Sequence, residues 1–135
     1  MTRSDGILHS IMLVEDDADI QEVAMIALED VGGFKVTACD DGLAALRQIR
    51  QARPDLLLLD WMMPNLDGGQ VALAMREQGL LGDTPIIFMT AKARPEEQQR
   101  MRELGAVDII TKPFDVMGLA ERVQATWDRL VAKIL

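Results

Sequence analysis

Cysteine and aromatic residues are scarce in this chain of 135 residues. Cys39 is the one cysteine, and there is no tyrosine. A disulfide within the chain is therefore impossible, and a reducing compartment suits the protein. Cys39 falls in an apolar segment, where a cysteine usually serves as a small buried hydrophobe.

Positive charge and long apolar runs are also lacking. The chain has 14 Lys and Arg against 22 Asp and Glu, a formal net charge of −8. This excess argues against a nucleic-acid backbone or an anionic membrane as a direct partner. No apolar run approaches the roughly 20 residues that span a bilayer, and the N-terminal residues show no signal-peptide pattern. We expect a cytoplasmic protein.

The composition is that of an ordinary globular protein, with 49% apolar and 27% charged residues. We predict one domain over residues 1–135, with a core of about 9–132 and no output domain. Short apolar runs alternate with segments of helical period. The apolar runs are Ser10–Val14, Phe34–Cys39, Leu56–Leu59, Pro85–Met89 and Val107–Thr111. The helical segments are Ile20–Val31, Leu43–Ile49, Gly69–Gln78, Pro95 to just before Gly105, and about Asp115 to Ile134.

This alternation predicts an α/β fold. Strands alternating with helices imply parallel pairing and right-handed crossovers. Five such units predict a three-layer αβα sandwich around a five-stranded parallel sheet, in the strand order 2-1-3-4-5 that flavodoxin-like folds adopt. The run Phe34–Cys39 alternates apolar and polar residues, which places it at an edge of the sheet.

Acidic residues follow the first and third predicted strands. Glu15 and Asp16 come after the first, and Asp60 after the third. Because these strands are neighbours in the expected order, we predict that the three carboxylates converge. At an effective dielectric constant of about 20 and a spacing of about 5 Å, each pair costs roughly 3 kcal/mol. A divalent cation with oxygen ligands, such as Mg2+, would relieve this repulsion.

Other acidic residues have a simpler interpretation. Asp17 and Asp41 each stand just before a predicted helix, where aspartate is a common N-cap. Lys112 and Thr90 end the fifth and fourth strands. Lys112 could pair with a carboxylate and later with a phosphoryl oxygen. Thr90 could be a hydroxyl donor to that oxygen or merely a β-branched strand residue. A carboxylate nucleophile, Mg2+, an ammonium and a hydroxyl together indicate a phosphoryl acceptor.

At these positions the chain resembles the response-regulator receiver family, over nearly its whole length. Residues 60–68, DWMMPNLDG, match the family pattern D-x-x-M-P-x-x-D-G without a gap. The family's acid pair falls on Glu15 and Asp16, its phosphoacceptor on Asp60, its switch hydroxyl on Thr90 and its lysine on Lys112 before Pro113, where the family often has a cis peptide bond.

The resemblance implies a mechanism and partners. Mg2+ would be held by Asp16, Asp60 and the backbone carbonyl of Met62, and by Glu15 through a water. A sensor histidine kinase or a histidine phosphotransfer protein would donate the phosphoryl group. The chain would then be a signalling switch that also removes its own phosphate, and not an enzyme. The fourth helix, fifth strand and fifth helix would present the changed surface to a downstream effector or output domain, or to a second copy in a homodimer.

One position departs from the family pattern. Ile109 stands three residues before Lys112, where the family usually has Tyr or Phe as part of the switch. Two alternatives stay open, and Ile109 bears on the second. A magnesium phosphatase or mutase also uses an aspartyl nucleophile, but typically adds an acid two residues later, where this chain has Met62. An interaction module that no longer needs phosphate is the second alternative.

Overall fold

The computed structural model describes residues 5–134, without the side chain of Ile134, which the predicted apolar stripe of the last helix includes. The strands are β1 Ser10–Val14, β2 Lys35–Cys39, β3 Leu56–Asp60, β4 Ile86–Thr90 and β5 Ala106–Thr111. The helices are α1 Ala18–Met25 with its continuation η1 Ile26–Val31, α2 Gly42–Ala52, α3 Gly68–Glu77, α4 Pro95–Glu103 and α5 Leu119–Ile134. No helix among the described residues is long and apolar enough to cross a membrane.

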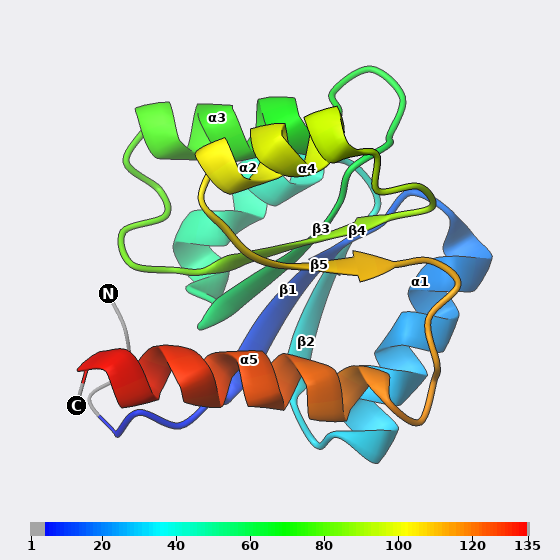
Figure 1. Ribbon diagram of the computed structural model, residues 1–135, viewed down its shortest axis with the longest axis vertical. Helices are drawn as coiled ribbons and strands as arrows, with labels where there is room; N and C mark the ends of the chain where they lie inside the picture. Colours follow the sequence, from blue (N-terminus) through cyan, green and yellow to red (C-terminus); the bar gives the residue numbers. More distant parts are fainter. Residues whose placement is uncertain (1–4, 135) are drawn as a thin grey trace.

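The five strands form one parallel sheet in the order β2-β1-β3-β4-β5. Helices α1 and α5 cover one face of the sheet, and α2, α3 and α4 cover the other (Figure 1). The predicted three-layer αβα sandwich and its strand order are therefore confirmed.

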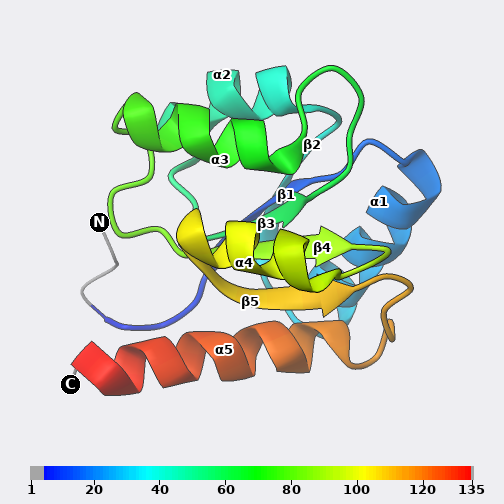
Figure 2. The ribbon, with the colours of Figure 1, turned by 45° about the horizontal axis from the view of Figure 1, so that its top comes forward.

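Each face of the sheet has its own apolar core. On one side Ile11, Leu13 and Leu58 pack with residues of α1 and α5. On the other side Leu57 and Leu59 pack with residues of α2, α3 and α4, the layer that comes forward in Figure 2. Because β1, β3 and β4 are buried over their whole length, their sequences are almost unbroken apolar runs.

The edge position of β2 is confirmed as well. Lys35 is exposed, the next three residues are half-buried, and Cys39 is buried at the end of the strand. The wet face of an edge strand tolerates the alternation of polar and apolar residues that the sequence shows.

Two helix boundaries depend on local hydrogen bonds. The side chains of Asp17 and Asp41 accept hydrogen bonds from the first turns of α1 and α2, which confirms both as N-caps.

The last helix begins at Leu119 and not near Asp115 as predicted. Asp115 instead closes a turn, in which its carboxylate accepts from the Met117 N–H and its carbonyl from the Leu119 N–H.

Candidate functional site

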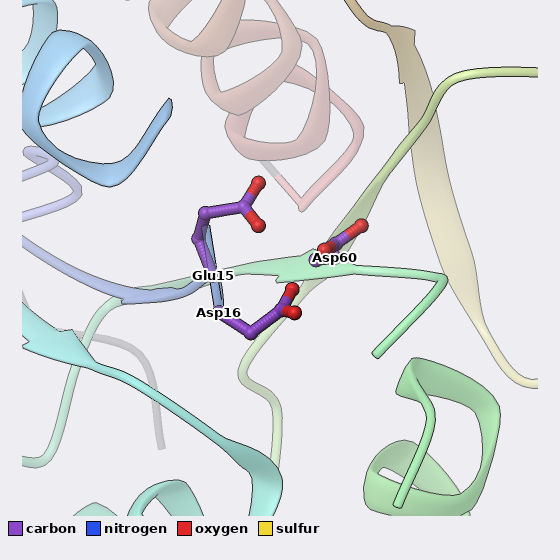
Figure 3. Close-up of side chains that lie close together, drawn as sticks. All are labelled: Glu15, Asp16 and Asp60. Carbon is purple, nitrogen blue, oxygen red and sulfur yellow. The ribbon is translucent and has the colours of Figure 1, made fainter. Parts of the chain in front are cut away.

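The parallel pairing of β1 with β3 brings the predicted acids together. Val14 lies opposite Leu59 in the sheet, so Glu15 and Asp60 leave neighbouring strand ends side by side. Oxygen atoms of Glu15, Asp16 and Asp60 lie within 4.8 Å of one another, and their carboxylates point toward a common centre (Figure 3). The predicted acidic cluster therefore exists at the carboxyl edge of the sheet.

Burial makes this cluster energetically costly. Glu15 and Asp60 are each 1% exposed, whereas Asp16 faces solvent. The Nζ atom of Lys112 donates to Glu15 Oε1 at 3.0 Å and to Asp60 Oδ1 at 3.1 Å. When all four side chains are ionised, three carboxylates meet one ammonium, so negative charge remains in excess. Removing that charge from water has a cost that one lysine does not fully offset.

The pKa of Asp60 reflects the imbalance. Burial, and next the hydrogen bond and charge of Glu15, raise the pKa of Asp60 from 3.8 to about 7 despite the opposing effect of Lys112. Burial alone would lower the pKa of Lys112, but its contacts with Glu15 and Asp60 outweigh burial and raise it. The site favours an added proton on Asp60 or an added cation beside it.

The donor set suits a hard divalent cation. Carboxylate and carbonyl oxygens are the ligands that Mg2+ prefers, and three carboxylates with surplus negative charge are on hand. The backbone of Met62 is held next to Asp60, because its N–H donates to Asp60 Oδ1 at 3.3 Å. Both oxygens of Glu15 already have partners, Lys112 for Oε1 and the Asp17 N–H for Oε2. Such a carboxylate suits contact with a cation through water more than direct ligation.

Thr90 lies at the end of β4, beside the strand that carries Asp60, and is 1% exposed. Its hydroxyl donates to the Lys92 carbonyl at 2.8 Å and accepts from the Lys92 N–H at 3.3 Å. Thr90 is thus in the predicted place, and its hydroxyl holds the loop between β4 and α4. The Lys112 N–H donates to the Thr90 carbonyl at 2.7 Å, which ties the two strand ends together.

The comparisons with known proteins decide the family. Residues 11–124 match the model of the response regulator receiver domain. The chain belongs to this family. The phosphate regulon transcriptional regulatory protein PhoB of Escherichia coli (strain K12) is 37% identical over 120 residues, which cover 89% of this chain and 52% of that protein. The transcriptional regulatory protein CseB of Streptomyces coelicolor is 40% identical over 119 residues, 88% of this chain and 49% of that protein.

Solved structures of receiver domains have the same fold. The chemotaxis protein CheY4 of Vibrio cholerae aligns with a TM-score of 0.82 at 29% identity, over 89% of this chain and 99% of that chain. The receiver domain of the Francisella response regulator 1452 aligns with a TM-score of 0.79 at 30% identity, over 90% and 98%. This receiver domain spans about half the length of the curated relatives it matches.

Two further features of the receiver domain agree with the family pattern. The Lys112–Pro113 peptide bond is cis, as the resemblance implied. The last residue of the D-x-x-M-P-x-x-D-G pattern must be small, because a Cβ on Gly68 would lie 2.3 Å from the carbonyl oxygen of Asp60. The glycine of the pattern therefore lets the chain return against the backbone of Asp60.

The departure at Ile109 has a clear structural setting. The side chain is partly buried and packs with the core on the side of α2, α3 and α4. An aliphatic side chain there has no hydroxyl to offer, so it can act on its neighbours only by packing.

The sequence did not predict the role of Trp61. Its indole N–H donates to Glu97 Oε2 at 3.0 Å, and its ring meets Phe88 edge-on at 5.0 Å between centroids. Trp61 follows Asp60 directly, whereas Glu97 belongs to the first turn of α4. Adjacency to Asp60 was the one available signal, and it does not reveal a partner 36 residues away.

Proposed function

We propose that this receiver domain takes a phosphoryl group onto Asp60 from a phosphohistidine of a sensor histidine kinase or a histidine phosphotransfer protein. The observation that carries the proposal is the meeting of buried Asp60 with Glu15, Asp16 and Lys112 at one edge of the sheet. An acceptor of this kind needs positioning and charge neutralisation more than proton transfer.

Each residue has a defined part in the transfer. An oxygen of the Asp60 carboxylate attacks phosphorus, and the bond from phosphorus to the histidine nitrogen breaks with its electron pair going to nitrogen. Asp16, Asp60 and the Met62 carbonyl would hold Mg2+, with Glu15 acting through a water. Bound Mg2+ supplies charge neutralisation to the carboxylates and the phosphoryl oxygens. Lys112 stays beside Asp60 and pairs with a phosphoryl oxygen.

The return to the resting state uses the same residues. A water attacks phosphorus, the bond to Asp60 breaks, and inorganic phosphate leaves. In the phosphorylated state the Thr90 hydroxyl leaves the Lys92 carbonyl and donates to a phosphoryl oxygen. Because this hydroxyl anchors the loop before α4, its movement alters the surface of α4, β5 and α5. A downstream effector, an output domain or a second copy would bind that surface.

A groove beside the site offers the donor an approach. Its volume is about 490 Å3, and its lining includes Ile20, Val23, Lys112 and Phe114. An apolar rim next to Lys112 suits a protein donor better than a small anionic metabolite. We place this exchange in the cytoplasm, and the net charge of −8 makes direct contact of this chain with nucleic acid unfavourable.

Intact-mass spectrometry after incubation with acetyl phosphate and Mg2+ tests the proposal. We expect one added group of about 80 Da on the wild type and none on Asp60→Asn. Asp55→Asn is the matched control, since it changes a buried aspartate at the opposite end of β3 and should keep the adduct. Multiple turnover of acetyl phosphate at an enzyme's rate would favour a phosphatase. No adduct at any Mg2+ concentration would favour an interaction module.

A further inference from the structure

The Trp61 indole joins the phosphoacceptor strand to α4. The hydrogen bond from Trp61 Nε1 to Glu97 Oε2 is 3.0 Å long and part-buried, and Trp61 is 7% exposed. A hydrogen bond to a charged acceptor that is shielded from water is stronger than an ordinary one. This contact therefore fixes the first turn of α4 to the residue after Asp60.

The tryptophan end of this contact is rigid. The Trp61 N–H donates to the Met89 carbonyl at 2.8 Å, and the Trp61 carbonyl accepts from the Gly68 N–H at 3.0 Å. Gly69 lets the ring pack closely, since a Cβ there would lie 3.2 Å from two of its carbons. Phe88 also meets the ring edge-on, so the indole is confined, and we expect any change in the contact to come from the glutamate.

The glutamate end is held more loosely. Of the nine residues of α4, all within the described range, Met101 alone is buried. The N-cap residue Arg94 makes no side-chain hydrogen bond to the helix, whereas α3 has a capping box of Asp67 and Gln70. A helix with one buried side chain and no side-chain cap depends on contacts such as the one at Glu97.

The loop that leads into α4 depends on Thr90. Glu97, Thr90 and Lys92 line one groove of about 320 Å3 together with Met62. While the Thr90 hydroxyl holds the Lys92 carbonyl, the loop and the first turn of α4 keep their place. If the hydroxyl turns to a phosphoryl oxygen, that anchor is lost and Glu97 is free to leave the indole.

We propose that the Trp61–Glu97 hydrogen bond is a latch of the resting state that opens when Asp60 is phosphorylated. The inference rests on the proposed function and extends it. It names a polar link between the end of β3 and α4. Ile109 cannot supply such a link, because its side chain carries no hydroxyl. The latch opposes activation, and its removal favours the active arrangement.

Thermodynamic coupling makes this testable with a phosphoryl mimic. A bond present only in the resting state must be broken by whatever binds the active state, so deleting the bond tightens that binding. For one hydrogen bond we expect Glu97→Ala to bind beryllofluoride, in the presence of Mg2+, about three- to tenfold more tightly than the wild type. General damage to α4 would instead leave that affinity unchanged or weaken it.

The experiment combines titration with NMR of the two indole N–H groups, those of Trp61 and Trp127. Both tryptophans are labelled with 15N, and Trp127→Phe assigns the two signals. Glu97→Ala should shift the Trp61 signal alone, and beryllofluoride should shift the wild-type signal in the same direction. Glu97→Gln keeps an acceptor oxygen but loses its charge, so its affinity should lie between those of the wild type and Glu97→Ala. Glu96→Ala, at an exposed glutamate of the same turn, is the matched control and should behave as the wild type.

The outcomes separate the two claims. If beryllofluoride binds the wild type while Glu97→Ala shows equal or weaker affinity, the latch is wrong and the proposed function stands. The latch is also wrong if beryllofluoride leaves the Trp61 signal in place. If the wild type fails to bind beryllofluoride with Mg2+, the proposed function fails and the latch fails with it.

Discussion

A buried aspartate lies at each end of β3, Asp55 just before the strand and Asp60 as its last residue. The groups around the two carboxylates differ in their charge. Asp55, just before the strand, is 6% exposed, and its Oδ2 accepts from the N–H groups of His9 at 2.9 Å and Ser10 at 3.0 Å. Asp60, at the other end, is 1% exposed and lies beside the carboxylates of Glu15 and Asp16. Asp55 meets the positive ends of backbone dipoles, whereas Asp60 meets two carboxylates and one ammonium, that of Lys112.

The comparison shows what distinguishes a structural acid from a chemical one in this fold. Burial is nearly equal at the two ends, so burial is not the distinction. Backbone donors stabilise the charge of Asp55 and join β3 to the start of β1. At Asp60 the negative charge is left under-compensated, so adding a proton or a cation becomes favourable.

The largest expected effect is the loss of the structural acid. Asp55→Ala leaves the His9 and Ser10 N–H groups without this acceptor, so we expect the free energy of unfolding to fall by about 2–4 kcal/mol. Urea denaturation measures it. The phosphoryl adduct on Asp60 should persist in the folded fraction. A loss below about 0.5 kcal/mol would mean that water replaces the carboxylate at no cost, and the contrast between the two ends would weaken.

The opposite change is expected at the other end of the strand. Asp60→Asn removes one charge from a crowded site, so with a chelator present it should raise the free energy of unfolding by about 1–3 kcal/mol. Mg2+ should stabilise the wild type and have much less effect on Asp60→Asn, as thermal melts with and without the ion would reveal. Equal melting temperatures for the two proteins, each with and without Mg2+, would contradict the repulsion among the three carboxylates.

The pH dependence of the metal-free protein should report the charge of Asp60. The pKa of Asp60 is raised by folding from 3.8 to about 7, so the folded state holds a proton that the unfolded state has lost. Its contribution to stability is complete below about pH 4 and disappears as the pH rises through about 7. Between pH 5 and 8 we expect the wild type to lose about 1–2 kcal/mol relative to Asp60→Asn in a chelator. Parallel curves for the two proteins would be the contrary result.

The smallest effect is expected at a third aspartate, which has a charged partner near solvent. Burial alone would raise the pKa of Asp108, but its hydrogen bonds with Arg122, Ile109 and Thr126 outweigh burial and lower it. The stabilisation is therefore present at neutral pH and is lost only as the pH falls below the ordinary aspartate range. Because the Arg122 side chain is 51% exposed, Asp108→Asn should cost only about 0.5–1 kcal/mol at pH 7. Urea denaturation of the wild type and Asp108→Asn at pH 7 and at pH 3 measures the difference in their free energy of unfolding at each pH.

Much of the site could be predicted because it sits where strands end. Unbroken apolar runs mark buried parallel strands, and the residue after each run then lies at the carboxyl edge of the sheet. Glu15, Asp16, Asp60, Thr90 and Lys112 all follow or end such runs, so their place at this edge could be predicted from the sequence. The prediction requires only the order and direction of the strands, and few topologies are open to five alternating β-α units.

The contacts that the sequence did not reveal depend on side-chain direction between distant segments. Trp61 and Glu97 are 36 residues apart, and their hydrogen bond requires a particular rotamer of each and the packing of α4 on the sheet. The role of Asp55 likewise depends on the exact pairing of β3 with β1. The late start of α5 reflects the turn at Asp115, whose residues have no pattern that separates a turn from a first helical turn.

The close approach at Gly68 has a consequence for how the switch can diverge. The Gly68 N–H donates to the Trp61 carbonyl at 3.0 Å. This hydrogen bond joins the two ends of the loop from Trp61 to Gly68. Residues within the loop, such as the exposed Met62, can be exchanged while the acceptor keeps its position. Substitutions in this short surface segment can therefore change the groups that face solvent beside Asp60 and leave the fold intact.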